Sequence, residues 1–320
     1  MSTLHPVRVG LVGLGVIGAV HRDVLAARDD VRLVFVADPR LPRDATDGVP
    51  RFGSVDAALD AGIEVDLVVV ATPTDTHLDV VGQVLEKTDA DVLSEKPIGR
   101  DPQALRRFAE RHADDVGRVR VVNHFAFSPE IVWAADAVAT RGWGPPRHVL
   151  SCFDDPYVAK TPDERRSYVS SWVDSGANQF AFLARFAGGW SVTAHDADAD
   201  GLRSVTEVAF DGGTGTLTTN WWTGASSKQT TLRWDEGREL VLDHTSMTGV
   251  LLDGGRVREH LGNDGTVDRK TAHYTAMYRA VLDGTEGELL GFPFAAGITG
   301  LLAATAPQRS GVAWTLTGGA

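Results

Sequence analysis

Short apolar runs alternate with amphipathic stretches through the first third of the chain. The apolar runs are rich in β-branched residues and predict strands at Val7–Val12, Val31–Ala37, Leu67–Ala71, Val92–Ser94 and Val119–Val122. Between these runs, apolar residues at helical spacing predict helices over Val16–Arg28, Asp56–Ala61, Thr76–Lys87 and Asp101–His112. Apolar strands that alternate with helices are typical of a parallel sheet covered on both faces.

The second half of the chain follows a different pattern. Apolar and polar residues alternate in several segments between positions 190 and 260, including Thr206–Phe210, Gly215–Trp221, Thr230–Trp234 and Glu239–Asp243. Turns rich in Gly and Asp separate these segments, so we predict an antiparallel meander with tight hairpins. Helices are expected over about Ser175–Phe186, Ala272–Leu282 and about Phe294–Thr305.

The change of pattern near Val122–Phe127 divides the chain into two predicted domains. Residues 1–124 are expected to form an α/β domain on the parallel sheet. Residues 125–320 are expected to form an α+β domain with an open, mostly antiparallel sheet, and its last helix can pack back on the first domain. The length of 320 residues supports this division, because single hydrophobic cores stop growing near this size.

The charge balance excludes some classes of partner. Lys and Arg together number 31 and Asp and Glu 43, which gives a formal net charge of −12. This charge opposes contact with the phosphates of nucleic acids, and no long run of like charges forms a local basic patch. The hydrophobic fraction of 43% is too high for a disordered chain. We therefore expect a globular protein that binds no nucleic acid.

Targeting features and cysteine usage predict a cytoplasmic protein. The longest apolar stretch, Phe292–Ala304, is broken by Pro and Gly and is too short to cross a bilayer. No basic segment followed by an apolar one begins the chain, so no secretory signal is expected. Cys152 is the single cysteine, which rules out an internal disulfide and a cysteine-cluster metal site. Because His244, His260 and His273 lack metal-ligand spacing, we expect no metal site. Because the longest apolar stretch is too short to cross a bilayer, we also expect no membrane contact.

A glycine pattern, Gly13-x-Gly15-x-x-Gly18, lies between the first predicted strand and the first helix. Gly13 would allow a tight turn, Gly15 would let the backbone approach a pyrophosphate, and Gly18 would let helix and strand pack closely. The free N–H groups of the helix N-terminus would hold the diphosphate. We predict that this turn, together with Val16 and Ile17, binds a dinucleotide.

An acidic residue strengthens this prediction. Asp38 ends the second predicted strand, 20 residues after Gly18, where a carboxylate would hold the ribose hydroxyls of the adenosine. A carboxylate repels a 2′-phosphate, which favours NAD. Arg40 lies two residues farther on and could instead accept NADP or stack on the adenine. We therefore expect NAD or NADP, with NAD preferred.

Polar motifs follow the third and fourth predicted strands. In a doubly wound sheet the carboxyl ends of the strands line the ligand crevice, so both motifs are expected to face the nicotinamide. The cofactor-binding residues expected here are Thr72, Pro73, Thr74, His77, Glu95 and Lys96. A lysine beside a carboxylate at the end of a strand is usually a solvated surface pair, and these residues alone favour that interpretation.

Three motifs together resemble a known family. The sequences GLGVIG at 13–18, ATPTDTH at 71–77 and SEKPIG at 94–99 are similar to those of the glucose-fructose oxidoreductase / inositol dehydrogenase (Gfo/Idh/MocA) family. The resemblance covers nearly the whole chain. It implies a Rossmann domain followed by an α/β domain whose open sheet commonly builds oligomers. It also implies NAD(P)-dependent oxidation of a sugar or polyol hydroxyl, or reduction of the ketone, with Lys96 as a catalytic residue.

The second-domain signature of this family is changed in this chain. The family has Asp-x-Gly-x-His at the start of a helix, and this chain has Asp174, Gly176 and Asn178 at these positions. The later Asp of the family falls on Ala181. Asn has no proton that titrates near neutral pH, so the usual imidazole acid/base is absent. The Asp-x-Gly-x-Asn variant resembles the aldose 1-dehydrogenase branch, which includes L-arabinose and galactose dehydrogenases.

Two interpretations of this change remain open. In the first, Lys96 is the acid/base, Asp174 tunes and positions it, and Asn178 hydrogen-bonds the reacting oxygen. A lysine can serve as the base for alcohol oxidation when burial and the positive nicotinamide ring favour its neutral form. In the second, the site has decayed or been repurposed. We favour the first interpretation, because Lys96 and Asp174 are both retained.

The long polar segment Asp154–Trp172 offers candidate substrate contacts. Its aromatic side chains could stack on a sugar ring, and Arg165 and Arg166 could bind a phosphate. A solvated, charged turn is an equal alternative. The full set of expected substrate residues is Lys96, Phe125, Tyr157, Arg166, Trp172, Asp174 and Asn178, and Asn123 is expected at the nicotinamide.

Three functions compete at this point. The preferred one is an NAD(P)-dependent oxidoreductase acting on a sugar, sugar derivative or polyol as an aldose 1-dehydrogenase, which Asn178 supports. The first alternative is a ketoreductase on a phosphorylated or nucleotide-linked sugar, which only Arg165 and Arg166 support. The second is a non-catalytic dinucleotide-binding sensor, which has no need of the retained lysine and aspartate. The resemblance also implies a homo-oligomer, a dimer or tetramer, formed through the second sheet.

Overall fold

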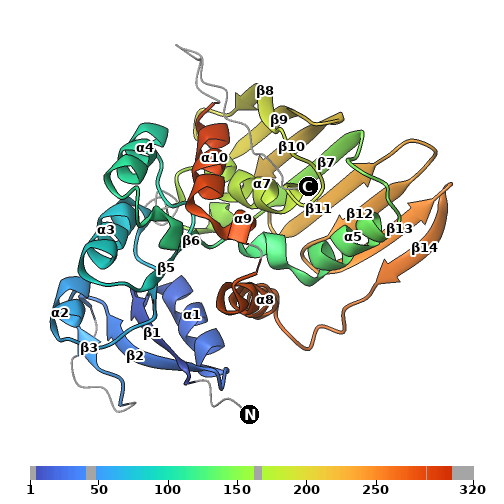
Figure 1. Cartoon of the computed structure of the whole chain (residues 1–320). Coiled ribbons are helices and arrows are strands. Elements are labelled where there is room, and N and C mark those ends of the chain that lie inside the picture. The colour runs from blue at the N-terminus through green and yellow to red at the C-terminus, as the bar shows by residue number, and fades with distance from the viewer. Residues whose placement is uncertain (1–4, 41–47, 162–167, 286, 305–320) are drawn as a thin grey trace. The chain divides into compact units, whose positions relative to one another are not determined.

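The computed structural model describes residues 5–40, 48–161, 168–285 and 287–304 (Figure 1). The chain divides into two compact units. Unit 1 contains residues 1–122 and 290–296, and unit 2 contains residues 123–289 and 297–320. A short segment near the C-terminus therefore belongs to the first unit.

Unit 1 is built on a six-stranded parallel sheet with the order β3-β2-β1-β4-β5-β6. The strands are β1 (Val7–Val12), β2 (Val31–Ala37), β3 (Arg51–Phe52), β4 (Leu67–Val70), β5 (Asp91–Ser94) and β6 (Val119–Val121). All the predicted strands are present, and β3 is too short for its pattern to be recognised. The order reverses between β1 and β4, as in the doubly wound dinucleotide-binding fold, whose ligands bind beside the carboxyl ends of the strands.

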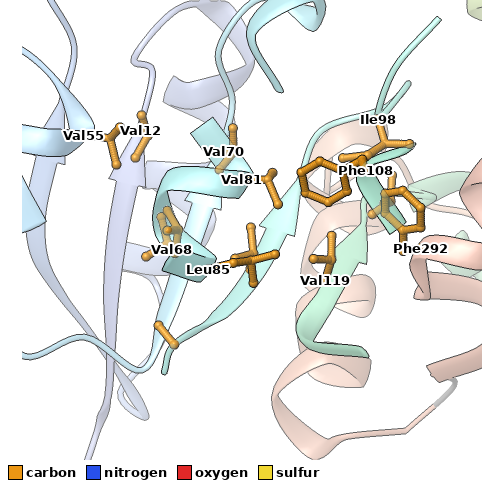
Figure 2. Close-up of a cluster of buried hydrophobic side chains, with 14 of the residues drawn as sticks. Val12, Val55, Val68, Val70, Val81, Leu85, Ile98, Phe108, Val119 and Phe292 are labelled. Atoms are coloured by element: carbon orange, nitrogen blue, oxygen red, sulfur yellow. The ribbon is translucent and has the colours of Figure 1, made fainter. Parts of the chain in front are cut away.

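Helices cover this sheet and enclose an apolar core. They are α1 (Val16–Ala26), α2 (Val55–Asp60), α3 (His77–Lys87) and α4 (Pro102–Arg111), with the 3-10 turns η1 (Thr74–Thr76) and η2 (Val116–Arg118). Side chains from the strands meet those of the helices in one buried cluster that includes Val68, Leu85 and Phe108 (Figure 2). Phe292 stacks on Phe108 with 5.6 Å between the ring centroids, so the returning segment 290–296 completes this core.

Unit 2 is built on an eight-stranded, mostly antiparallel sheet with the order β14-β13-β12-β11-β7-β10-β9-β8. The strands are β7 (His148–Asp154), β8 (Ser191–Ala197), β9 (Arg203–Phe210), β10 (Gly213–Asn220), β11 (Ser227–Arg233), β12 (Glu239–Asp243), β13 (Thr248–Asp253) and β14 (Arg256–Leu261). The expected fold class, a parallel-sheet domain followed by an open, mostly antiparallel sheet, is confirmed.

The predicted meander is wrong at one place. β7 lies between β10 and β11, and it is parallel to β10 and antiparallel to β11. The consecutive strands β10 and β11 are therefore not neighbours. An alternating pattern identifies a strand and its buried face, but it does not identify the partner, and β7 comes from a distant part of the sequence.

The helices of unit 2 also differ from the prediction in detail. They are α5 (Pro129–Thr140), α7 (Ala177–Leu183), α8 (Arg269–Asp283) and α9 (Gly287–Leu290), with the 3-10 turns η3 (His124–Phe127) and η4 (Tyr157–Ala159). The sequence pattern did not predict α5. A π-helix, η5 (Trp172–Gly176), precedes α7, so the single helix expected from Ser175 is a wide turn followed by a shorter α-helix. α10 (Phe292–Ala303) begins in unit 1 and ends in unit 2.

One face of the second sheet is buried and the other is exposed. Along β7, Ser151 and Phe153 are fully buried, whereas Leu150 is 43% exposed. Gln179 of α7 hydrogen-bonds Ser151 on the buried face, and Trp133 of α5 lies against Gly249 of β13. Helices α5 and α7 therefore cover the buried face.

Candidate functional site

The glycine turn between β1 and α1 has the shape that a dinucleotide requires. Gly13 has a φ of 90°, and a Cβ there would lie 2.6 Å from the carbonyl oxygen of Ala71. A Cβ on Gly18 would collide with the carbonyl oxygen of Gly13. On Gly15 it would meet no described atom within 4 Å, and α1 has no side-chain N-cap. The backbone N–H groups that begin α1 are therefore open to a diphosphate, so the turn fits the expected cofactor.

Asp38 braces this turn from the end of β2. Its Oδ2 accepts the N–H of Leu14 at 2.8 Å, and its Oδ1 accepts the N–H of Arg40 at 2.8 Å. Each carboxylate oxygen has a second acceptor position, so the same group can also accept ribose hydroxyls. Val16, the first residue of α1, is 77% exposed beside the turn, and Ile17 is half-buried.

His77 connects the two motifs that follow β4 and β5. Its buried ring has Nε2 at 2.8 Å from the carbonyl oxygen of Thr72 and Nδ1 at 2.9 Å from that of Pro97. The hydroxyl of Thr76 donates to the carbonyl oxygen of Pro73 at 2.8 Å. His77 thus fixes the backbone of both loops, and a contact of these residues with the cofactor stays a prediction.

A buried pair joins α1 to the segment that carries Lys96. The Nε2 of His21, on α1, lies 3.0 Å from Oε1 of Glu95. The Oε2 of Glu95 accepts the N–H of Lys96 at 3.1 Å. His21 is fully buried and Glu95 is 7% exposed. Sequence analysis missed His21, because a single histidine on the inner face of a helix forms no recognisable pattern.

A second group of polar side chains lies in unit 2, around Asp174. Lys228 of β11 forms an ion pair with Asp155, and its Nζ also donates to the hydroxyl of Ser226 at 3.1 Å. The Oδ2 of Asp155 accepts the O–H of Ser175 at 3.3 Å. Lys228 and Asp155 are 3% and 8% exposed. Because Ser175 follows Asp174 in the chain, its hydrogen bond to Asp155 links the ion pair to the backbone next to Asp174, the predicted catalytic residue.

Charges in this group act on Tyr157. Burial raises the pKa of the half-buried Tyr157 far above its usual value, the carboxylates of Asp174 and Asp155 add to this shift, and Arg269 opposes it. Tyr157 is therefore a neutral hydroxyl at physiological pH. Burial lowers the pKa of Lys228, while Asp155 opposes that shift. Tyr157 and Lys228 thus both respond to the carboxylates of Asp155 and Asp174 and to the charge of Arg269.

The helix that carries Asn178 is anchored from inside unit 2. Asn178 is partly buried on α7. The next residue, Gln179, is fully buried, and its Nε2 donates to the hydroxyl of Ser151 at 3.0 Å and to the carbonyl oxygen of Thr218 at 3.2 Å. Asp174 lies one wide turn earlier, on η5. π-turns inside helices are frequent at functional sites.

Trp172 is placed as a packing side chain. It is 3% exposed, its indole N–H donates to the carbonyl oxygen of Leu302 at 3.3 Å, and its ring lies 5.8 Å from that of Phe180. A substrate contact by Trp172 therefore stays a prediction that its burial does not favour.

The remaining expected residues follow β6 or lie in the polar segment. Asn123 is buried, and its Nδ2 donates to the carbonyl oxygen of Leu289 at 2.8 Å. Phe125 is buried against Phe153, with ring centroids 5.3 Å apart. Arg166 and its neighbour Arg165 lie outside the described residues.

Sequence analysis missed three residues of the group around Asp174, namely Asp155, Lys228 and Arg269. Lys228 occupies an inward position of β11, on the same face as the buried Thr230. The predicted strand began at Thr230 and the predicted helix at Ala272, so neither Lys228 nor Arg269 was placed on an element. The available signal was that Lys228 would face inward if the strand predicted from Thr230 were extended by two residues toward the N-terminus.

The described ranges contain neither a metal-binding cluster of side chains nor a helix that could cross a membrane. Within those ranges, no group of His, Cys, Asp or Glu side chains is arranged to hold a metal ion. No helix in the described part of the chain has the length and apolar character needed to cross a membrane.

Comparison with known proteins gives a family match within the first part of the chain. Residues 7–124 match the GFO_IDH_MocA model, described as an oxidoreductase family with an NAD-binding Rossmann fold. An inositol 2-dehydrogenase of Rhizobium meliloti (strain 1021) is 33% identical over 165 residues, which are 50% of this chain and 49% of that protein. The match thus spans about half the length of this curated relative.

Solved structures share the fold over nearly the whole chain. A myo-inositol dehydrogenase from Corynebacterium glutamicum ATCC 13032 has a TM-score of 0.75 and 20% identity, and the match covers 94% of this chain and 95% of that one. GenD2 from gentamicin A biosynthesis, in complex with NAD, has a TM-score of 0.73 and 22% identity, with 100% and 98% covered. Residues 7–124 therefore match the GFO_IDH_MocA oxidoreductase family, and the solved structures show the same fold for nearly the whole chain.

Proposed function

We propose that the protein is an NAD(P)-dependent oxidoreductase that transfers a hydride between the nicotinamide and a carbinol or carbonyl carbon of a sugar, sugar derivative or polyol. One observation carries the proposal. His21 and Glu95 bind the backbone of Lys96 to α1, the helix that begins at the glycine turn. The backbone of a lysine is thereby linked, through the side chain of Glu95, to the helix that follows the dinucleotide turn. The name of the inositol 2-dehydrogenase relative supports the substrate class.

The residues of the chain have to move one proton and orient one oxygen. When bound, the nicotinamide takes up or gives the hydride. Lys96 takes the hydroxyl proton during oxidation and returns it during reduction. Asp174 and Asn178 orient the reacting oxygen, since an amide both donates and accepts hydrogen bonds without titrating. The Asn178 variant favours an aldose 1-dehydrogenase within this class.

NAD is the proposed cofactor. The carboxylate of Asp38 ends β2, where it would accept the ribose hydroxyls and repel a 2′-phosphate. The side chain of Arg40 is exposed nearby and is the group that would favour NADP.

Absorbance at 340 nm tests the proposal. Purified protein is mixed with NAD and, separately, with NADP, against a panel of aldoses, polyols and inositols. We expect one of these compounds to reduce NAD faster than NADP. If no compound of the panel changes the absorbance at 340 nm while calorimetry shows that the cofactor still binds, a free sugar or polyol as substrate would be contradicted. A second panel of phosphorylated and nucleotide-linked sugars then separates the ketoreductase from the non-catalytic sensor.

A further inference from the structure

Two cations lie on one pair of aromatic rings in unit 2. The rings of Phe125 and Phe153 are in contact, with centroids 5.3 Å apart. The guanidinium carbon of Arg269 lies 5.5 Å from the centroid of Phe125, and the Nζ of Lys228 lies 5.5 Å from the centroid of Phe153. Both phenylalanines are buried, so each cation rests on an apolar surface.

Lys228 is neutralised by its surroundings. Its Nζ is paired with the carboxylate of Asp155, and it also donates to Ser226 Oγ at 3.1 Å and to the carbonyl oxygen of Asp154 at 3.4 Å. The three donor positions of the ammonium group are thus used within the protein. Lys228 therefore has no capacity left for a ligand.

Arg269 has no such partners. It is half-buried at the first position of α8, and its guanidinium forms no ion pair or hydrogen bond within residues 5–40, 48–161, 168–285 and 287–304. The carboxylate that precedes it in the chain, Asp268, is used in the helix cap, where it accepts the N–H and the hydroxyl of Thr271. The first turn of α8 contains no acidic residue.

The surroundings of Arg269 make its unpaired charge costly. A cation at a helix N-terminus is opposed by the helix dipole. One turn along α8, His273 is buried with its Nε2 lacking a hydrogen-bond partner among the described residues, and Phe125 touches both side chains. Burial lowers the pKa of His273, and Arg269 adds to this effect. A half-buried cation that has no ion-pair partner among the described residues is stabilised most directly by an anion from outside the chain.

We propose that Arg269 binds an anionic group of the substrate, a carboxylate or a phosphate, and so selects acidic sugars or sugar phosphates over neutral ones. The inference rests on the proposed function. Tyr157 connects Arg269 to the predicted catalytic group, because the charges of both Arg269 and Asp174 act on its hydroxyl. The planar guanidinium can donate two parallel hydrogen bonds to either kind of anion.

Ligand binding to the NADH-loaded protein tests this inference without turnover, and the same titrations are repeated without NADH. Galacturonate and glucose 6-phosphate are the anionic probes, with galactose and glucose as their neutral counterparts. Kd values are measured by calorimetry for the wild type, Arg269→Gln and Arg269→Lys. Arg279→Gln is the matched control, since Arg279 is an exposed arginine on the same helix. Thermal unfolding confirms that each variant is folded.

We expect the wild type to bind one anionic probe at least about tenfold more tightly than its neutral counterpart, the effect of one hydrogen-bonded charge pair. Arg269→Gln should lose this preference, Arg269→Lys should keep part of it, and Arg279→Gln should keep all of it. The probe that is preferred identifies the anion as carboxylate or phosphate.

Equal affinity for acidic and neutral sugars in the wild type, or an unchanged preference in a folded Arg269→Gln, would overturn the inference. Its failure is distinct from that of the proposed function. A preference that depends on Arg269, without turnover of any acidic sugar by NAD or NADP, would refute the oxidoreductase and leave the anion site. Turnover of a sugar by NAD or NADP, together with equal affinity of the wild type for acidic and neutral sugars, would do the reverse.

Discussion

Gly15 and Gly18 share one motif but meet different constraints. A Cβ on Gly18 would collide with the backbone of Gly13, so Gly18→Ala should destabilise unit 1 by about 1–3 kcal/mol. Gly15→Ala places its methyl group in open space and should leave stability unchanged. That space is where the diphosphate is expected, so Gly15→Ala should weaken NAD binding at least about tenfold. Thermal unfolding and calorimetry separate the two effects. Normal NAD affinity in Gly15→Ala would place the diphosphate elsewhere.

His273 should make the stability of unit 2 depend on pH. Burial, with Arg269 and His244, lowers the pKa of His273 well below its usual value of 6.5. Below that pH the unfolded chain protonates this imidazole while the folded unit keeps it neutral, until the pH falls through the lower pKa. The unfolded state therefore binds more protons in this window. Stability should fall with decreasing pH by up to about 1.4 kcal/mol per pH unit from this residue.

Urea unfolding of the wild type and of His273→Gln, between about pH 5 and pH 7, measures this contribution. The free energy of unfolding of His273→Gln should decrease less steeply as the pH falls. Equal slopes for the two proteins would show that His273 titrates normally in the folded state.

The elements of unit 1 were predictable because its strands are short, apolar and separated by helices. Every predicted strand of its sheet is present, and the polar motifs follow β4 and β5 as expected. In unit 2 the alternation identified β9 to β12, but it did not show that β7 enters between β10 and β11. Register and partners depend on contacts that are distant in sequence, which a local pattern does not contain.

The candidate site was predictable only where a motif marked it. Motifs in the sequence pointed to the glycine turn, Asp38 and Lys96 as candidates, whereas no motif pointed to Lys228 or Arg269. Lys228 is held by its ion pair with Asp155, which directly follows β7, and Arg269 lies over the ring of Phe125. Such partners are brought together by the sheet and have no fixed spacing in the sequence. The π-turn at Asp174 likewise has no sequence pattern that distinguishes it from an α-helix.

We predict that Lys228, Asp155 and Ser175 hold Asp174 in position by joining β11, the end of β7 and η5. Lys228→Met would leave a buried, unpaired carboxylate and should cost about 3–5 kcal/mol of stability. Adding Asp155→Leu removes that charge and should restore most of the stability, but not kcat, because Ser175 then loses its acceptor. Ser175→Ala should lower kcat with a small change in stability.

Urea unfolding and turnover, measured on the same samples, test this prediction of a positioning role. If the double variant regains kcat together with stability, the ion pair is structural only, and Asp174 does not depend on it. Cofactor affinity should be unchanged in all these variants, because the dinucleotide features are in unit 1.

At the scale of the whole molecule, the exposed face of the second sheet predicts self-association. Leu150 and Val241 are 43% and 38% exposed, and both pair with Thr231, which lies between them in the sheet. Apolar side chains gathered on an open sheet usually mark a partner surface. We expect a dimer or tetramer by light scattering. Leu150→Glu with Val241→Glu should shift it to the monomer, whereas Val132→Glu, on α5 over the other face, should not. A monomeric wild type would contradict this prediction.

The central claim is that Lys96 moves the proton while the features of unit 1 hold the cofactor. The most direct test is kcat of Lys96→Met, with NAD affinity measured on the same sample. Lys87→Met, which removes a surface lysine of α3, is the control. We predict a loss of about 10²–10⁴ in kcat for Lys96→Met, with NAD still bound, and wild-type turnover for Lys87→Met. Turnover by Lys96→Met at the rate of the wild type would contradict the account.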